Sequence, residues 1–476
     1  TLTSNFYGSE HPLYLGEYRH AFRNSNLILD FGYTQGYKKT SVTKKSGDKS
    51  HFFSQFVKNF DGKKNSKNSL QIVTQNTSND KYLKLYKIKS NLVDNETEVL
   101  ENSLSLSHEN DNFFLGLDIS SYETLKSGFN DKYEYIFPDI TFDKNLMSND
   151  IFGNLDLQSN FKVHNYDTNK TTKFLINDFD WKFREIFLNS GINSKILGKF
   201  KNINYDAKNV EDLRVDTTNE FHGAVGVLSE IKLFKQISEF HKQFLKPKLL
   251  VRYAPGNMRT ESSDARLTPD DAFLLDRLNN PNNFENGLSA SFGLDYEINA
   301  KDKNYYLSMA QVLNEKENKK MPNASSLNSK LSDLVVNSRI DFNTKLNFDY
   351  NFSLDHNYKD FNYNEFGANI NLNPIKFDFS YLQENKHIGD QEYFKAKMDI
   401  SRNENGIFSF ETKRNLITNS SEFYNLSYEY MNDCLRAGLV YRREFYDDSE
   451  LEAENSLMFK ITIVPFGEID TPSFKN

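Results

Sequence analysis

Apolar and polar residues alternate with a period of two along most of this chain. In "TKLNFDYNFSLD", every second residue from Leu346 to Leu354 is apolar and the residues between them are polar. The stretches "GLSASFGLDYE" and "NFFLGLDIS" follow the same rule. A strand places such alternate residues on one face, whereas a helix would spread them around its circumference. We therefore predict a succession of strands, each apolar on one face only.

Short turns join these strands into hairpins. In "FGANINLNPIKFDFSYL", the alternation shifts by one residue at Asn373–Pro374, and the apolar positions then continue on the second strand. An antiparallel hairpin needs this shift to keep both apolar sets on one side of the sheet. Short turns also alternate with longer polar connections, for which we take residues 38–50 and 314–330 as examples. Short turns at one end and long loops at the other are typical of outer-membrane barrels.

The number and length of the segments predict the fold class. About two dozen segments have the alternating pattern, and many have about 9–11 residues, the length with which a tilted strand crosses a bilayer. Lipid offers no partners to a sheet edge, so strands in a membrane must close into a ring. We predict an all-β fold, a large closed antiparallel transmembrane β-barrel of about 24–26 strands over residues 1–467, with a tail at 468–476.

A soluble sandwich would explain the alternation of any single strand equally well. The length of the strands and an apolar face rich in Phe, Tyr and Leu favour the barrel. One region, 254–287, lacks alternation and is predicted to be a long structured loop with a short helix in "LTPDDAFLLDRLNN". There Thr268 would be the N-cap and Pro269 the first helical residue, followed by Asp270 and Asp271 in the first turn.

Composition agrees with one-faced strands. Only 38% of the residues are hydrophobic, yet 14% are aromatic, with 41 Phe and 26 Tyr. A disordered chain would be poor in aromatic residues. The net charge of -8 argues against a nucleic-acid partner, which would require a basic surface. The single cysteine, Cys434, excludes a disulfide within the chain and a zinc cluster built on cysteines.

Candidate catalytic chemistry is sparse. No GxSxG, HExxH or Walker sequence occurs, so we expect no enzyme, cofactor or metal centre. Asp178 and Asp180 stand at alternate positions, as polar residues facing the barrel interior would. We place the basic residues of the last hairpins, Arg436, Arg442 and Arg443, on the polar faces of their strands, where they fit two interpretations. They could meet phosphate groups, or they could line the interior in charge pairs.

The C-terminal hairpins, "YNLSYEYMNDCLRAGLVYRREF" followed by "LMFKITIVPFG", resemble the end of the LptD family of lipopolysaccharide-assembly proteins, of the α-proteobacterial type. The resemblance extends to "HPLYLGEYRHAFRNSNLILDFGYTQG", "YEYIFPDITFDKNL" and "PKLLVRYAPGNMR". It covers essentially the whole chain and is most specific at the last hairpins.

This resemblance implies an integral protein of the Gram-negative outer membrane that inserts lipopolysaccharide into the outer leaflet. The family's N-terminal periplasmic jelly-roll domain is expected to be absent from this chain, and it would connect to a periplasmic bridge of Lpt proteins. A lipoprotein, LptE, would plug the barrel, and membrane lipid would surround it. The alternative is a passive pore or a TonB-dependent-type receptor, which would need a plug domain and an energy-coupling box.

The resemblance also implies particular site residues. Lipopolysaccharide would leave through a lateral gate between the first and last strands. The last strand carries Phe459, Ile461 and Ile463 on one face and Lys460 and Thr462 on the other. "TLTSNFYG" would be the first or the second strand. In the family, cysteines near the position of Cys434 pair with the N-terminal domain, so Cys434 would either pair with a partner outside this chain or remain a free thiol.

Overall fold

The computed structural model describes residues 1–463 except 8–10, 40–43, 63–65, 89, 127–130, 168, 189–190, 262–265, 279, 344, 387–389, 404, 433–434 and 445–454. Within these residues, one antiparallel sheet of 26 strand segments accounts for most of the chain. The first half comprises β1 (Leu2–Tyr7), β2 (Leu13–Ala21), β3 (Ser25–Lys39), β4 (Lys44–Asp61), β5 (Lys67–Thr77), β6 (Val99–Glu109), β7 (Phe113–Thr124), β8 (Tyr133–Asn149), β9 (Gly153–Tyr166), β10 (Lys170–Lys182), β11 (Ile186–Phe187), β12 (Ile192–Lys208) and β13 (Thr218–Ile231).

The second half of the sheet continues in chain order. Its strands are β14 (Leu233–Ser238), β15 (His241–Ala254), β16 (Gly287–Ala300), β17 (Lys303–Asn314), β18 (Leu334–Phe342), β19 (Leu346–Leu354), β20 (Phe361–Leu372), β21 (Ile375–Glu384), β22 (Gln391–Asn403), β23 (Gly406–Asn415), β24 (Ser420–Met431), β25 (Leu435–Glu444) and β26 (Asn455–Ile463). The helical elements among the described residues are short: α1 (Tyr82–Tyr86) and the 3-10 turns η1 (Asp271–Phe273) and η2 (Asn323–Ser325).

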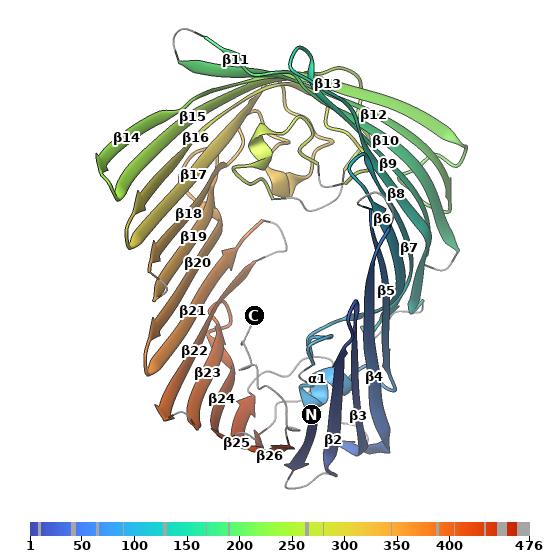
Figure 1. The fold of residues 1–476 in the computed structure, drawn as a ribbon, viewed down its shortest axis with the longest axis vertical. Helices are drawn as coiled ribbons and strands as arrows, with labels where there is room; N and C mark the ends of the chain where they lie inside the picture. Colours follow the sequence, from blue (N-terminus) through green and yellow to red (C-terminus); the bar gives the residue numbers. More distant parts are fainter. Residues whose placement is uncertain are drawn as a thin grey trace.

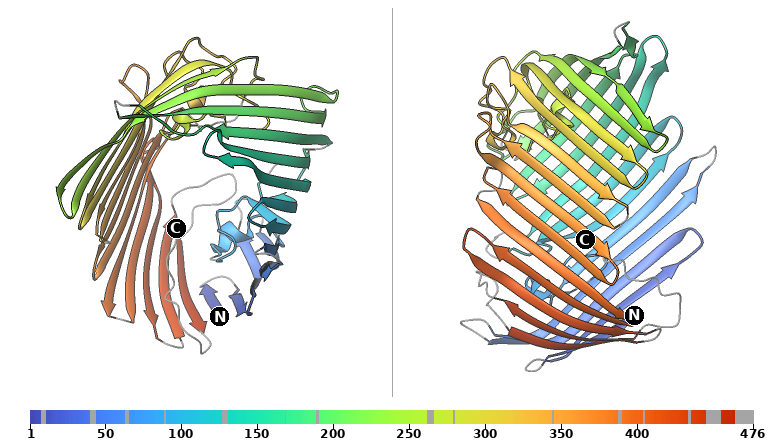
Figure 2. Two further views of the ribbon diagram at one scale, coloured as in Figure 1. Left: turned by 45° about the horizontal axis from the view of Figure 1, so that its top comes forward. Right: turned by 90° about the vertical axis from the view of Figure 1, so that its left-hand side faces the viewer.

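The sheet closes on itself, so the predicted barrel is confirmed. β1 pairs with β26 in an antiparallel ladder, although the two are at opposite ends of the chain (Figure 1). β10 and β11 both pair with β12, and β13 and β14 both pair with β15. Each of these two pairs is one interrupted strand. The ring therefore has 24 strands, which run obliquely along the barrel (Figure 2).

An internal loop shows which face of the sheet is which. Helix α1 lies inside the ring (Figure 1), and its cluster packs on Leu13 of β2 and Phe53 of β4. The alternate residues Tyr14 and Phe52 must then point outward, where their side chains are 52% and 46% exposed. Outward rows of exposed Phe, Tyr and Leu recur on the other strands, as the lipid-facing band of a membrane barrel requires.

Turns and loops divide between the two ends of the barrel. Turns of a few residues, such as Asn373–Pro374 between β20 and β21, lie at the end that holds the start of β1 and the end of β26. In that hairpin Leu372 pairs with Ile375, so the predicted shift in alternation is confirmed. The long connections 78–98, 255–286 and 315–333 lie at the other end. The short-turn end is therefore the periplasmic one.

Two local predictions were wrong. The expected helix after Thr268 is only the 3-10 turn η1, although the Thr268 hydroxyl does accept a hydrogen bond from the Asp271 amide at 3.2 Å. The segment packs as irregular chain against β12–β18, because tertiary contacts outweigh the helix signal of its first turn. The expected polar connection 38–50 is largely strand, since β3 runs to Lys39 and β4 begins at Lys44. The predicted tail, 468–476, lies outside the described residues.

The inside–outside assignment predicts a difference between two substitutions in β25. Leu439 is outward and half exposed, with Tyr428 and Phe459 as its register neighbours, whereas Arg436 points inward. Leu439→Arg should cost about 2–4 kcal/mol of folding free energy in a bilayer, and Arg436→Leu should cost less. Urea titration of the two variants refolded into lipid vesicles measures this difference. Equal tolerance would contradict the assignment.

Candidate functional site

The sequence-predicted last strand forms one side of a seam in the barrel wall. β1 is the first strand of the ring, and its residues 2–7 pair with 463–458 of β26. Leu2 and Phe6 face Ile463 and Phe459 on the lipid side. Phe459, Ile461 and Ile463 therefore point outward, and Lys460 and Thr462 point inward, as their alternation indicates.

Polar side chains meet on the inner side of the seam. The hydroxyl oxygens of Thr3 and Thr462 are hydrogen-bonded at 2.9 Å, which links the two strands through side chains. Asn5 and Lys460 are register partners one step further along. The Asn5 side chain is only 6% exposed. At the seam, an apolar outer surface and a polar inner surface are thus separated only by the thickness of one sheet.

The seam is a short ladder between short strands. β1 pairs with β26 over six residues and with β2 over only four, from Leu2–Gly16 to Asn5–Leu13. The ladder between β3 and β4 has fifteen residue pairs. Since a backbone hydrogen bond contributes about 1 kcal/mol net, β1 is held far less firmly than the strands beyond it. Opening here would break fewer bonds than opening at the long ladders.

The basic residues of the last hairpins have separate surroundings. Arg436 faces inward beside Thr462, and its Nε lies 3.1 Å from a Glu429 carboxylate oxygen. Arg442 faces inward with its guanidinium 4.5 Å from the centre of the Phe423 ring. Alternation places the neighbouring Arg443 on the opposite, outer face, so the expectation that all three share the polar face was wrong. Cys434 lies outside the described residues.

A loop that sequence reasoning missed lies beside the seam. The connection 78–98, which contains α1, packs against the inner side of the first strands through Tyr82, Leu83 and Tyr86. The Tyr86 ring meets the Tyr7 ring of β1 edge-on at 5.9 Å. The available signal was a loss of alternation after Thr77 combined with apolar residues at helical spacing.

Polar contacts fasten the same loop. The Tyr82 hydroxyl is 3.1 Å from His51 of β4, whose other ring nitrogen is 2.9 Å from an Asp30 carboxylate oxygen of β3. The Asn91 amide donates to the Glu17 carboxylate of β2 at 2.8 Å. Strands β1–β4 are thus joined from inside by one loop on their side of the seam.

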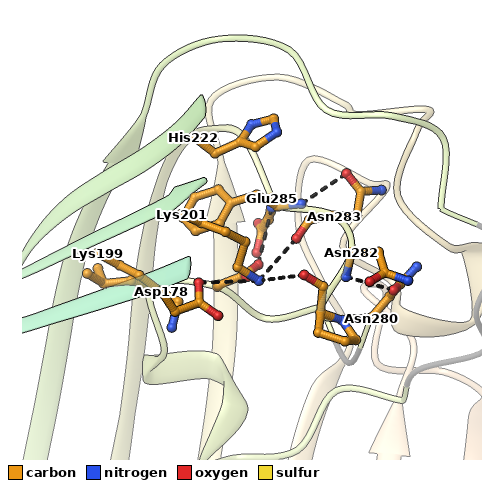
Figure 3. A network of polar contacts seen from close by, with 12 residues as sticks. Asp178, Lys199, Lys201, His222, Asn280, Asn282, Asn283 and Glu285 are labelled. Carbon is orange, nitrogen blue, oxygen red and sulfur yellow. Dashed lines mark hydrogen bonds and ion pairs between the residues drawn. The ribbon is translucent and has the colours of Figure 1, made fainter. Parts of the chain in front are cut away.

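The long loop 255–286 occupies the opposite part of the interior and is held there by charged groups (Figure 3). The Lys201 ammonium of β12 lies 3.2 Å from Asp276 and donates to the carbonyl oxygens of Pro281 and Asn283 at 3.1 and 3.3 Å. The same ammonium is 3.8 Å from Asp178 of β10. These contacts anchor the loop to the inner wall.

Two arginines complete the anchor. Arg252 of β15 is 1% exposed and donates through Nε to the Leu275 carbonyl at 2.5 Å, and also to the carbonyl of Glu285. Arg277 forms a two-point pair with the Glu285 carboxylate, with one contact at 2.7 Å, and reaches the Ser289 hydroxyl at 3.1 Å. Burial alone would raise the pKa of the Glu285 carboxyl, but Arg277 and Arg252 hold that pKa below its usual value.

The described residues bring no three His, Cys, Asp or Glu side chains together in a way that could hold a metal ion. Asp178 and Asp180 have lysine partners instead, Lys201 and Lys199 respectively. Among the described helices, none has the length and apolar character needed to cross a membrane.

The comparisons with known proteins bear on this architecture. A family model described as "LptD: LPS transport system D" matches residues 54–406, which is most of the chain. The chain belongs to the LptD family. As an LptD-family barrel it is an integral β-barrel of the outer membrane. A search among curated proteins found no match.

A search of solved structures found matches of low similarity. The FrpB iron transporter of Neisseria meningitidis (F3-3 variant) is 8% identical, with a TM-score of 0.45, over 97% of this chain and 80% of its own. The siderophore receptor PiuA and the ferric preacinetobactin receptor BauA, both of Acinetobacter baumannii, are each 8% identical, with TM-scores of 0.39 and 0.40. Each match covers 97% of this chain, with 80% of PiuA and 79% of BauA. At this level of similarity they say nothing about what an LptD-family chain transports.

The weak pairing of β1 predicts a gradient of backbone protection. In detergent or nanodiscs, amide hydrogens of β1 should exchange faster than those of β3 and β4 by roughly an order of magnitude or more, because each absent ladder bond removes about 1 kcal/mol of protection. Hydrogen exchange followed by mass spectrometry measures this. Equal protection of β1 and β3 would show that the seam is as firm as the rest of the wall.

The loop anchor predicts a response to mutation and to acid. Glu285→Gln leaves two arginines without their counter-charge and should cost about 3–5 kcal/mol locally, so that protease cleaves the 255–286 loop at neutral pH. The pKa of Glu285 is lower in the folded protein than the value of about 4.3 expected in the unfolded chain. The stabilisation that the Glu285 carboxylate gives the loop is therefore fully present above about pH 4.3, and it is lost as the pH falls through the lower, folded pKa. The wild-type loop should then be cleaved by an acid-active protease only under acidic conditions. Glu239→Gln, in an exposed periplasmic turn, is the control.

Proposed function

We propose that this chain inserts lipopolysaccharide into the outer leaflet of the outer membrane through a lateral gate at the β1–β26 seam. The single observation that carries the proposal is the short, side-chain-bridged ladder between Leu2–Tyr7 and Met458–Ile463 in a chain of this family. The lipopolysaccharide sugar would stay on the polar inner side while its acyl chains pass into lipid. The step requires no covalent chemistry, and we propose no enzymatic activity.

The two sides of the seam support this route chemically. On the inner side, Thr3, Asn5, Lys460 and Thr462 offer hydroxyl, amide and ammonium groups that suit sugars and phosphates. On the outer side, Leu2 and Phe459 face the hydrocarbon. Breaking a ladder inside hydrocarbon exposes backbone groups at a cost of several kcal/mol each, so a short ladder is the favourable place for a gate.

Partners follow from the same proposal. A periplasmic Lpt bridge would deliver lipopolysaccharide from the short-turn end of the barrel, and an LptE-like lipoprotein would occupy part of the interior. The passive pore and the TonB-dependent-type receptor remain the alternative class. Among the described residues, no observation favours either one over the gate.

A reversible lock of the seam tests the proposal. In a Cys434→Ser background, Thr3→Cys with Thr462→Cys places two thiols where two hydroxyls now meet at 2.9 Å. Oxidation should abolish delivery of lipopolysaccharide to the cell surface, and a reducing agent should restore it. Surface lipopolysaccharide is measured by its accessibility to an outer-leaflet modifying enzyme.

The matched control is Ser194→Cys with Ser229→Cys, which joins β12 to β13 where two hydroxyls meet at 2.9 Å. This disulfide crosses a long, regular ladder of the wall and should leave delivery unchanged. Normal delivery with the Thr3–Thr462 pair fully oxidised would refute the lateral route. A solute-uptake assay on the same cells would then reveal whether the barrel acts as a pore.

A further inference from the structure

The barrel wall parts at a second place, between β5 and β6. Their ladder runs from Lys67–Glu109 to Val73–Ser103 and stops there, although β5 continues to Thr77 and β6 begins at Val99. The remaining residues of β5 stay paired with β4, and those of β6 stay paired with β7. The two strands therefore separate toward the long-loop end, which is the outer-leaflet side of the barrel.

Two side chains bridge the parted strands. The Asn102 amide accepts a hydrogen bond from the Gln75 backbone N–H at 2.9 Å and donates to the Gln75 carbonyl at 3.2 Å. The Gln75 side chain accepts from the Glu101 backbone N–H at 2.7 Å. The side-chain amides of Asn102 and Gln75 thus form hydrogen bonds that a backbone ladder would otherwise supply, while the two strands lie further apart. This arrangement lets the wall stay parted inside a membrane, where unpaired groups are costly.

Other irregularities lie in the same row of the sheet. Ser103 pairs with Ser120, and Ser120 pairs with Ile136. The register of β7 against β8 shifts between Asp118 and Ser120, and that of β8 against β9 shifts between Ile136 and Asp139. Three departures from a regular ladder thus gather across five neighbouring strands, β5–β9, with a cavity of about 320 Å³ among them.

The cavity is mainly apolar and belongs to the lipid face. Leu104 and Ile119 are register partners on the outward row that continues to the exposed Leu106 and Leu115. Ser121 is the register partner of Tyr135, whose side chain is 48% exposed, and Phe137 nearby is 60% exposed. The hollow therefore opens on the lipid-facing surface of the barrel.

We propose that this hollow, bounded by Leu104, Ile119, Ser121, Tyr135 and Phe137, is a lipid site that holds one acyl chain of an outer-leaflet lipid. The apolar walls suit a hydrocarbon chain. Such a chain would also fill the space where the strands part, which would otherwise be a void in a close-packed surface. The site is separate from the β1–β26 seam, and it requires only that the barrel lie in a bilayer.

Photo-crosslinking tests the site on the full chain in nanodiscs. The probe is a phosphatidylethanolamine with a diazirine on one acyl chain, and the labelled peptides are mapped by mass spectrometry. Peptides containing residues 104, 119 and 137 should be labelled at low probe fractions and should saturate. Peptides of the ordinary lipid face, such as that around Phe52, should gain label in proportion to the probe. Proportional labelling at both places would overturn the proposal.

A filled-site variant gives the second readout. Ser121→Phe places a ring in the hollow and should reduce labelling there to the level of the ordinary lipid face. Ser54→Phe makes the same change beside Phe52, on the outward row of a complete ladder, and should leave the labelling of the hollow unchanged. Heat-modifiable mobility on gels confirms that both variants fold. Unchanged labelling in folded Ser121→Phe would also overturn the proposal.

Discussion

Hydrocarbon offers no hydrogen-bond partner, so every backbone group in the membrane must be paired within the protein. This constraint determines the architecture of the chain. Most ladders join neighbours in sequence and can be long, as between β3 and β4. One ladder has to join the two ends, and here it is formed by a first strand of six residues. Closure is therefore complete in topology, and it depends on short ladders on both sides of β1.

The same constraint explains where irregular chain is allowed. The described residues of the segments 78–98, 255–286 and 315–333 form no named strand, and those of the first two pack against the inner wall. Their polar groups find partners on the strands, as Leu275 and Glu285 do with Arg252. Charged side chains can be buried there because each makes several polar contacts, whereas burying an unpaired charge would cost several kcal/mol of folding free energy. The charged side chains of the inner wall therefore anchor the loops and also make the barrel interior polar.

Much of the fold could be predicted from the sequence, because the alternation of residues such as Leu346–Leu354 depends only on strand geometry. The hairpin at Asn373–Pro374 and the inward and outward sets of the last strand followed from the same rule. What could not be predicted depends on contacts distant in sequence. The pairing of Thr3 with Thr462, and the inward packing of Tyr82 and Tyr86, leave no local signal that fixes their partners.

Two further errors have physical causes. Thr268 and the acidic residues after it have the local chemistry of a helix start, but the segment's apolar residues are used against the wall rather than along a helix face. The polar stretch 38–50 was predicted as loop because exposed ends of long barrel strands have the composition of loops. Alternation alone cannot distinguish a strand that leaves the bilayer from a turn.

The packing of the 78–98 loop makes the two flanks of the seam mechanically unequal. On one flank, contacts through Tyr7, His51 and Glu17 tie β1–β4 into a stiff block. On the other flank, β25 and β26 are joined to each other through a nine-residue ladder. If the two flanks were pulled apart, β25 and β26 would therefore be displaced more than β1–β4, because the loop fixes the four N-terminal strands to one another.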